Sequence, residues 1–346
     1  MREGLTIRIA CVCVALAAAA GGATAGSTNL YAPVADDIQL TDGVGSPIAA
    51  GVVDVFEDGG SEMILNLRAT TYNGFYETGH ELTLHNADGS FVRSLASSSG
   101  TAFKSFVCKE GADVYYGLQD DIYRVGYAGG ATGTVAAMNN HYDMRFDSTG
   151  RAFAVGNPGW AGNHIWLMDL TGGNSHTVVV QNAGVYSAEL ALDADDNLYY
   201  GTSGSGANEL RTFTAAQINA AIGGGTALDF ADGTHLTDLE LDAGGIEVDD
   251  AGNVVFTMNA WGGPHRLAII EDGASYTGTY QYDVLTSAAM FTTSVDALGD
   301  VMAYEHLAGD AAFTVGGGVL TQVPEPATAA LLLGGLAALR RRRRRR

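Results

Sequence analysis

Residues 144–153 read Met-Arg-Phe-Asp-Ser-Thr-Gly-Arg-Ala-Phe, a short strand-like run, an Asp-x-x-Gly turn and a second apolar run. An Asp side chain that bonds the backbone two residues on, followed by glycine at positive φ, is typical of a tight turn. Variants of the pattern recur, and the intervals Asp147 to Asp193, Asp193 to Asp249 and Asp249 to Asp296 are 46, 56 and 47 residues. The stretch therefore predicts a repeated strand–turn–strand unit.

The period of this unit predicts the fold. About 46 residues suit one four-stranded blade of a β-propeller, and weaker copies occur at residues 57–60 and 108–111. Residues 27–322 then divide into six or seven units. We expect an all-β, six- or seven-bladed β-propeller, with a pair of β-sandwiches or a β-solenoid as the alternatives. The longest interval contains one predicted helix, capped by Thr214 and Gln217 and followed by Gly223.

The repeated turn, with Asp, Gly or Asn before an aromatic or apolar run, resembles the blades of NHL-type and gluconolactonase-like propellers. The resemblance implies a propeller fold. In gluconolactonase-like hydrolases a central divalent ion polarises the carbonyl of a lactone, so the resemblance also implies such an ion as an expectation.

The N-terminus is typical of a secretory signal. Arg2 and Arg8 supply positive charge, residues 9–20 form an apolar stretch of 12, and Ala23-Thr24-Ala25 matches an A-x-A cleavage site. We expect a signal peptide over residues 1–25, with signal peptidase and the Sec export machinery as partners. The mature chain would keep only Cys108, which lies in an apolar run and is expected to be a buried, inert thiol.

The C-terminus carries a three-part pattern over residues 322–346. The sequence Pro324-Glu325-Pro326 is followed by a largely apolar segment, residues 327–339, and then by seven arginines, residues 340–346. This arrangement resembles the PEP-CTERM sorting tail, which an exosortase recognises in Gram-negative bacteria. Thirteen helical residues span only about 20 Å of a core about 30 Å thick. We therefore expect transient anchoring in the inner membrane before the tail is cleaved.

These two ends frame a body over residues 26–321, which we expect to be exported to the cell surface or extracellular matrix. Residues 27–322 carry 9 basic and 37 acidic residues. Such a surface repels nucleic acid, which is therefore not an expected partner, and attracts cations or basic polymers. Exopolysaccharide is a candidate partner, because many bacteria with such tails make it.

Two related loops suggest a ligand site. If the first strand of each blade lines the channel, the Asp-x-x-Gly turns lie on one face and the loops between second and third strands on the other. Two of these loops contain Trp with Asn and His, which can stack on and orient a sugar or a small polar ligand. Packing and turn capping are the competing interpretation. The candidates are Asn157, Trp160, His164, Asn259, Trp261 and His265.

Carboxylates near the channel suggest a metal site. Asp143 and Glu189 precede the turn of their own unit by four residues and, with Glu247, are candidate ligands for Ca²⁺. The sequence has no G-x-S-x-G elbow, H-E-x-x-H motif or Walker loop, so no catalytic residue is assigned. The interpretation favoured is a non-enzymatic binding or structural protein without a cofactor. The alternative is a calcium-dependent hydrolase or lactonase on a propeller scaffold.

Overall fold

The computed structural model describes most of the body of the chain. The described residues are 31–33, 40–48, 51–73, 76–157, 162–172, 175–184, 189–204, 208–239, 242–248, 252, 254–259, 265–270, 280–284, 289–295, 301–307 and 317–322. The predicted signal peptide and the part of the predicted sorting tail from Val323 onward lie outside this set. Among the described residues, no helix has the length and apolar composition that a membrane crossing requires.

Within the described residues, the strands form six sheets, which are antiparallel except for one pairing, and most neighbours in a sheet are consecutive in the chain. The first three sheets contain β2 (Val52–Asp58), β3 (Ser61–Ala69), β5 (Tyr76–Asn86) and β6 (Phe91–Thr101), with β4 (Tyr72–Asn73) against β5; β7 (Lys104–Glu110), β8 (Asp113–Leu118), β9 (Asp121–Gly126) and β10 (Gly133–Ala137); and β11 (His141–Phe146), β12 (Ala152–Gly156), β13 (His164–Leu167) and β14 (Thr177–Gln181). The other three contain β15 (Leu190–Leu192), β16 (Leu198–Gly201), β17 (Asn208–Phe213) and β19 (Thr234–Leu239); β20 (Asp242–Val248), β21 (Val254–Asn259), β22 (His265–Ile270) and β23 (Tyr280–Val284); and β24 (Ala289–Val295), β25 (Val301–Leu307), β26 (Gly317–Gln322) and β1 (Tyr31–Pro33).

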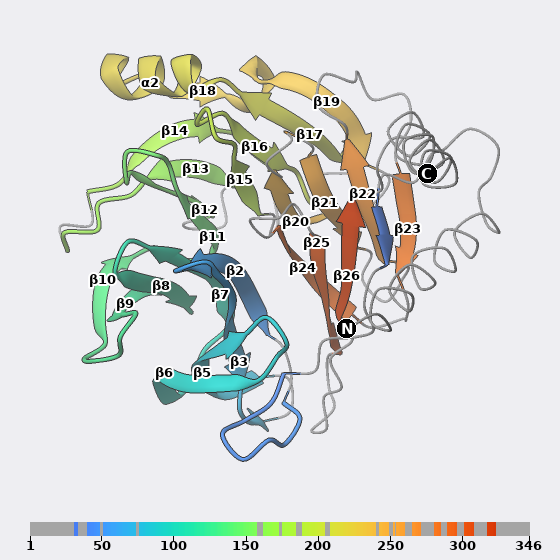
Figure 1. Ribbon diagram of the computed structural model, residues 1–346. Coiled ribbons are helices and arrows are strands. Elements are labelled where there is room, and N and C mark those ends of the chain that lie inside the picture. The colour runs from blue at the N-terminus through green and yellow to red at the C-terminus, as the bar shows by residue number, and fades with distance from the viewer. Residues whose placement is uncertain are drawn as a thin grey trace, which may run out of the picture.

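The first strands of the sheets stand around a common centre (Figure 1). Each contacts the first strand of the next sheet, in the order β2, β7, β11, β15, β20 and β24, and β24 contacts β2 again. Later strands of each sheet lie progressively further out. The predicted β-propeller is therefore confirmed, and neither a pair of sandwiches nor a solenoid describes this arrangement.

The Asp-x-x-Gly turns fold as their sequence requires. Oδ1 of Asp147 accepts hydrogen bonds from the backbone N–H of Thr149 at 3.0 Å and of Arg151 at 2.8 Å, while Gly150 has φ +82°. Asp193 holds the next copy in the same way, and there Asp196 takes the positive φ of 62°. The Asp side chain thus closes each of these turns by accepting hydrogen bonds from backbone N–H groups of the turn.

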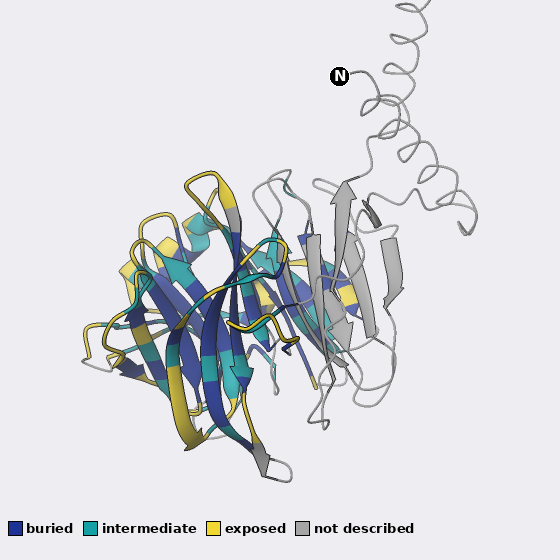
Figure 2. Ribbon diagram, turned by 60° about the horizontal axis from the view of Figure 1, so that its bottom comes forward, coloured by how far each residue is buried: buried dark blue, intermediate teal, exposed yellow. Residues whose placement is uncertain are grey.

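Neighbouring sheets pack through apolar clusters, and many residues of the described strands are buried (Figure 2). Leu84 and Val107 belong to a cluster that joins the first two sheets, and Phe106 and Met144 to a cluster that joins the second and third. The largest cluster continues through the third to the fifth sheets. The core is therefore a series of layers between sheets, and the centre of the ring is left to other side chains.

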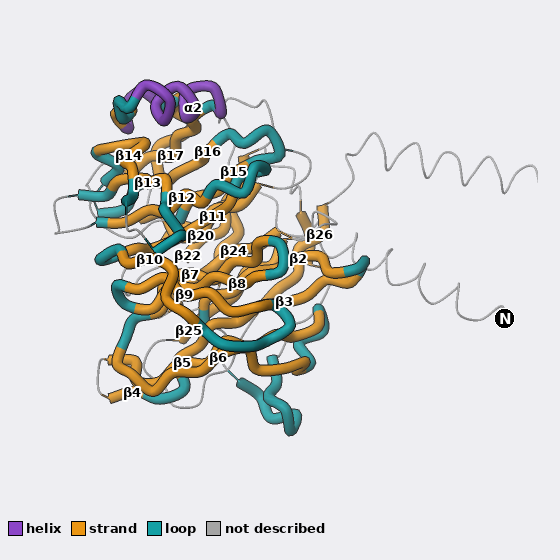
Figure 3. The backbone as a smooth tube through the Cα atoms, turned by 90° about the vertical axis from the view of Figure 1, so that its left-hand side faces the viewer, coloured by secondary structure: helices purple, strands orange, loops and turns teal. Residues whose placement is uncertain are grey.

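An insertion between β17 and β19 departs from the blade pattern. It contains helix α2 (Ala215–Gly224), strand β18 (Leu228–Asp229) and the 3₁₀ helix η2 (Phe230–Asp232). The predicted Thr214–Gln217 capping box is confirmed, but the helix ends at Gly225, with φ 64°, and not at Gly223. All three consecutive glycines permit a left-handed end, and the last one provides it. Strand β18 pairs in parallel with β14 of the preceding sheet, and α2 lies along the outer edge (Figure 3).

The turn carboxylate supports a first prediction. Asp147→Ala removes a side chain that is 1% exposed and that also pairs with Arg151 Nε at 2.6 Å. We expect the free energy of unfolding to fall by about 2 kcal/mol, as when a buried capping residue is lost. Chemical denaturation measures it. Asp195→Ala, at an exposed position of the neighbouring turn, is the control and should change stability by less than about 0.5 kcal/mol. Equal losses of stability in the two variants would contradict the role of Asp147 in closing its turn.

Candidate functional site

The centre of the ring holds a buried arginine. Asp143 and Arg145 are two residues apart on β11 and therefore face the same side of the strand. That side is the channel, because Arg145 reaches carboxylates on β2 and β20, the first strands of two sheets that are not its neighbours in the ring. The side chain of Arg145 is 14% exposed and that of Asp143 is 2% exposed.

Carboxylates from several sheets surround the guanidinium of Arg145. Its Nη2 donates a hydrogen bond to Oε1 of Glu247, on β20, at 2.8 Å. Its Nε lies 3.5 Å from Oδ2 of Asp143, and its Nη1 lies 3.7 Å from Oδ1 of Asp54, on β2. Glu189, just before β15, adds a fourth carboxylate whose charge acts on the same guanidinium. One cation thus serves acids from four sheets.

Backbone groups hold two of these carboxylates in position. Asp143 accepts hydrogen bonds from the N–H of Met144 at 2.8 Å and of Leu190 at 3.0 Å. Asp54 accepts from the N–H of Lys109 at 3.1 Å. Leu190 is on β15, next to the strand of Asp143, and Lys109 is on β7, next to the strand of Asp54. Each carboxylate therefore connects its own inner strand to the following one.

Burial shifts the pKa values of the cluster. It raises the pKa of Glu247 to about 7 and that of Asp54 to about 6, although the charge of Arg145 opposes both shifts. Burial also raises the pKa of Asp143, and that of Glu189 well above its ordinary value, where the charge of Asp143 adds to the effect. The cluster therefore contains carboxylates that exchange protons near neutral pH.

A cavity of about 180 Å³ opens beside this cluster. Its wall includes Asp54, Cys108, Lys109, Arg145, Leu192 and Glu247. Phe146 and Leu192, which directly precede the turn residues Asp147 and Asp193, also line it. The cavity therefore lies toward the end of the channel that carries the Asp-x-x-Gly turns. Burial raises the pKa of Cys108 well above the ordinary thiol value, which agrees with the inert thiol expected from the sequence.

The three predicted metal ligands come together in the channel. Asp143, Glu189 and Glu247 all act on Arg145, and their oxygen atoms suit Ca²⁺ chemically. The guanidinium of Arg145, however, forms ion pairs with both Glu247 and Asp143. A calcium ion bound by these carboxylates would therefore be repelled by the positive charge of Arg145. With Arg145 in place, the residues present do not fit a central Ca²⁺.

The described members of the predicted ligand set, Asn157, His164, Asn259 and His265, lie at strand ends away from the Asp-x-x-Gly turns. Asn157 is 1% exposed, and its Oδ1 accepts a hydrogen bond from the N–H of Gly162 at 3.0 Å. Nδ1 of His164 accepts from the N–H of Asn182 at 3.3 Å. Asn259 and His265 are cross-strand partners on β21 and β22. Trp160 and Trp261 lie outside the described residues, so the binding role of this set stays a prediction.

Sequence reasoning missed Arg145 and Asp54. The signal for Arg145 was present, because it stands two residues after Asp143 and therefore on the same strand face. Glu247 occupies the corresponding place in its own unit, two residues before Asp249. Asp54 had a weaker signal, because the turn that follows β2 is a degenerate copy of the repeat.

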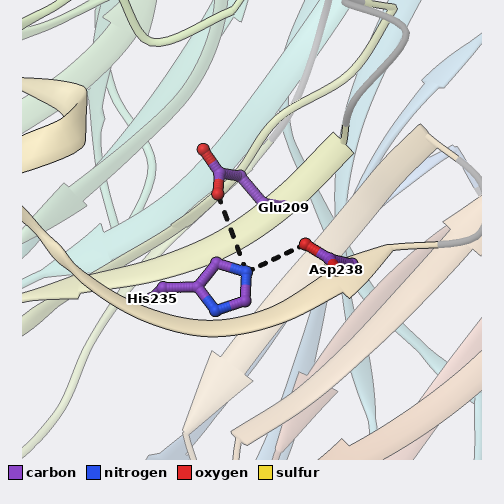
Figure 4. A group of neighbouring side chains, drawn as sticks. All are labelled: Glu209, His235 and Asp238. Atoms are coloured by element: carbon purple, nitrogen blue, oxygen red, sulfur yellow. Dashed lines mark hydrogen bonds and ion pairs between the residues drawn. The ribbon is translucent and has the colours of Figure 1, made fainter.

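A second polar group lies on the surface of the fourth sheet (Figure 4). Nε2 of His235 lies 3.0 Å from Oδ1 of Asp238 and 3.7 Å from Oε2 of Glu209. Among the described residues, this is the one group of three His, Cys, Asp or Glu side chains close enough to share an ion. Arg211 also pairs with Oε2 of Glu209, at 2.9 Å, and Asp238 is 93% exposed, so one carboxylate already has a cationic partner and the group is open to solvent.

Comparisons with known proteins identify the fold. No family model matches the sequence, and no curated protein matches it significantly. The PQQ-bound aldose sugar dehydrogenase of Streptomyces coelicolor aligns with a TM-score of 0.56 at 15% identity, over 84% of this chain and 97% of that chain. A luciferin-regenerating enzyme aligns at 0.55 and 11% identity, over 85% of this chain and 96% of that chain. Regucalcin of Agrobacterium tumefaciens, described as a calcium-binding protein, aligns at 0.53 and 12% identity, over 81% and 94%.

These likenesses support, at the level of fold, the resemblance to NHL-type and gluconolactonase-like propellers. Identities of 11–15% carry neither an activity nor a ligand to this chain.

The raised pKa of Glu247 supports a second prediction. In the folded chain Glu247 keeps its proton up to about pH 7, whereas the ordinary value is 4.5. Its contribution to stability is therefore present below pH 4.5 and is lost as pH rises through 7. We expect the stability of Glu247→Gln relative to the wild type to increase from pH 5 to pH 8 by about 2 kcal/mol.

Chemical denaturation at several pH values measures this difference. His85 and His141, whose pKa values burial lowers to about 4, are present in both proteins, so their effect cancels. Glu57→Gln, at an exposed position on β2, is the control. A constant difference between Glu247→Gln and the wild type would show that Glu247 is ionised throughout.

Proposed function

We propose that the protein is a hydrolase of the lactonase type whose reaction takes place in the channel cavity, without a central metal ion. The observation that carries this proposal is Glu247, a carboxylate with a pKa of about 7, hydrogen-bonded to Arg145 at 2.8 Å in the wall of the cavity. A general base with a pKa near the working pH and a fixed cation beside it are what ester hydrolysis needs.

The charges of the site indicate the class of substrate. Four carboxylates surround one guanidinium, so an anionic substrate would be repelled. Within the described residues, the guanidinium makes a single hydrogen bond, to Glu247. Its Nε is buried beside Asp143, so Nη1, which lies 3.7 Å from Asp54, is the nitrogen that can donate to a carbonyl oxygen. A small, uncharged lactone or ester suits both features and the size of the cavity.

The reaction then follows from the residues present. Ionised Glu247 takes a proton from water as the water oxygen attacks the carbonyl carbon, and Arg145 stabilises the negative charge that develops on the carbonyl oxygen. When the C–O bond of the ring breaks, protonated Glu247 returns the proton to the leaving alkoxide. The products are a hydroxy acid and the unchanged enzyme.

A panel of neutral lactones and aryl esters tests this proposal. We expect hydrolysis that persists in EDTA, with kcat/KM rising as pH increases through about 7 because the base must be ionised. Glu247→Gln should lower kcat/KM by at least about 100-fold. Glu209→Gln, on the surface, is the control. If the folded wild type hydrolyses none of these compounds, the proposal fails and a non-enzymatic binding protein is the better interpretation.

We propose further that the ring has six blades and that β1 closes the last of them. The six described sheets and the closed order of contacts between their first strands support this number. Strand β1 pairs with β26 through Tyr31↔Gln322 to Pro33↔Leu320, so one sheet joins the two ends of the body. Such a closure would resist opening of the ring.

We also propose that the protein is exported. This proposal rests on the sequence of the two ends: the apolar segment and A-x-A site before Gly26, and Pro324-Glu325-Pro326 before the apolar segment and arginines. Signal peptidase, the Sec machinery and an exosortase would be the partners, with transient anchoring in the inner membrane of a Gram-negative bacterium. The body would then be displayed at the surface or released into a matrix with exopolysaccharide.

The intact mass of the protein recovered from a host with an exosortase tests the export proposal. We expect a chain that begins near Gly26 and lacks the residues after the Pro324-Glu325-Pro326 motif. A matched variant with Pro324, Glu325 and Pro326 changed to alanine should retain the tail. Loss of the N-terminal segment alone from the unchanged protein would contradict exosortase processing.

A further inference from the structure

We infer that Arg145 is a built-in cation: its guanidinium takes the place that a divalent metal ion would hold among the channel carboxylates, and removing it turns the channel into a divalent-cation site. The inference concerns ion binding, and it does not depend on the proposed hydrolase activity.

The first step is the number and origin of the oxygen ligands. Asp54, Asp143, Glu189 and Glu247 come from four different sheets and converge on one side chain. Such a set is what a hard cation selects, since Ca²⁺ takes six to eight oxygen ligands, many of them carboxylates. A surface cluster of acids differs, because here the side chains are buried and three of them, Asp54, Asp143 and Glu247, stand on inner strands.

The second step is the balance of charge. Lys109 also lines the cavity, but its ammonium lies over the rings of Phe56 and Tyr127, 5.1 and 5.4 Å from their centroids. The charge of Lys109 acts on Asp54, but less than that of Arg145. In the described channel wall, Arg145 is the cation that forms the ion pairs with Asp54, Asp143 and Glu247. Without it the cluster would carry only negative or protonated groups, and a bound cation would restore the balance.

The third step is the space. Oxygen atoms of Glu247, Asp143 and Asp54 lie 2.8, 3.5 and 3.7 Å from three different nitrogens of the guanidinium, which holds them apart. Calcium–oxygen distances are about 2.3–2.6 Å, so these side chains would have to turn inward, toward the point that the guanidinium occupies, to share one ion. Arg145→Ala empties this point and joins it to the existing cavity, from which water can supply further ligands.

Calcium titration of matched variants tests the inference. All proteins carry His235→Ala, so that the surface group of Glu209, His235 and Asp238 cannot contribute an ion. Isothermal titration calorimetry and thermal denaturation are run with CaCl₂ at pH 8, where the carboxylates compete least with protons. We expect Arg145→Ala to bind one Ca²⁺ per chain, at least tenfold more tightly than the parent, and to melt at a higher temperature with Ca²⁺ than without.

Two further variants identify the site. Arg145→Lys keeps the positive charge and should bind no more Ca²⁺ than the parent. Glu247→Gln added to Arg145→Ala should weaken the new binding at least tenfold, because it removes one of the oxygen ligands.

Other outcomes have a definite meaning. A chain with Arg145→Ala that folds only in the presence of Ca²⁺ would support the inference. If that variant does not fold in either condition, Arg145→Gln takes its place. The inference is overturned if a folded variant without the arginine binds no Ca²⁺, or if the parent binds one Ca²⁺ that Glu247→Gln abolishes while Arg145 is present.

Discussion

The pairing of one guanidinium with carboxylates from four sheets is the constraint on which the centre of the ring depends. Burying a charge is costly unless it is paired and hydrogen-bonded. Here Arg145 is 14% exposed and Asp143 is 2% exposed, and each group lowers the cost of burying the other. The register of the inner strands is therefore fixed, because a shift of one residue would turn these side chains away from the channel.

The same register links the site to the turns. Asp147 and Asp193 close turns immediately after the two strands whose last residues, Phe146 and Leu192, line the cavity. Ser148 donates from its N–H and from its hydroxyl to the carboxylate of Asp196, both at 2.7 Å, which ties one turn to the next. The feature that repeats in the sequence thus shapes the rim of the cavity.

The fold was predictable because its signal is local and repeated. The Asp-x-x-Gly turn and its period near 46 residues indicate the blade, and the capping residue Thr214 indicates the helix. The site was predictable in part: Asp143, Glu189 and Glu247 were selected from their places near the repeat. Arg145 was missed because a search for metal ligands considers acids and histidines, and a cation among them is not part of that pattern. Asp54 depends on contacts between distant sheets, which a single sequence does not reveal.

The insertion that carries α2 and β18 has a mechanical consequence. Chain that belongs to the fourth sheet crosses to the third, where Leu228 and Asp229 pair with Val180 and Gln181 and where Asn219 accepts a hydrogen bond from Arg151 at 2.8 Å. A force that pulled these two blades apart would have to break backbone pairing as well as apolar contacts. The interface between the third and fourth blades is therefore reinforced, and mechanical unfolding of the ring would begin at a different interface between blades.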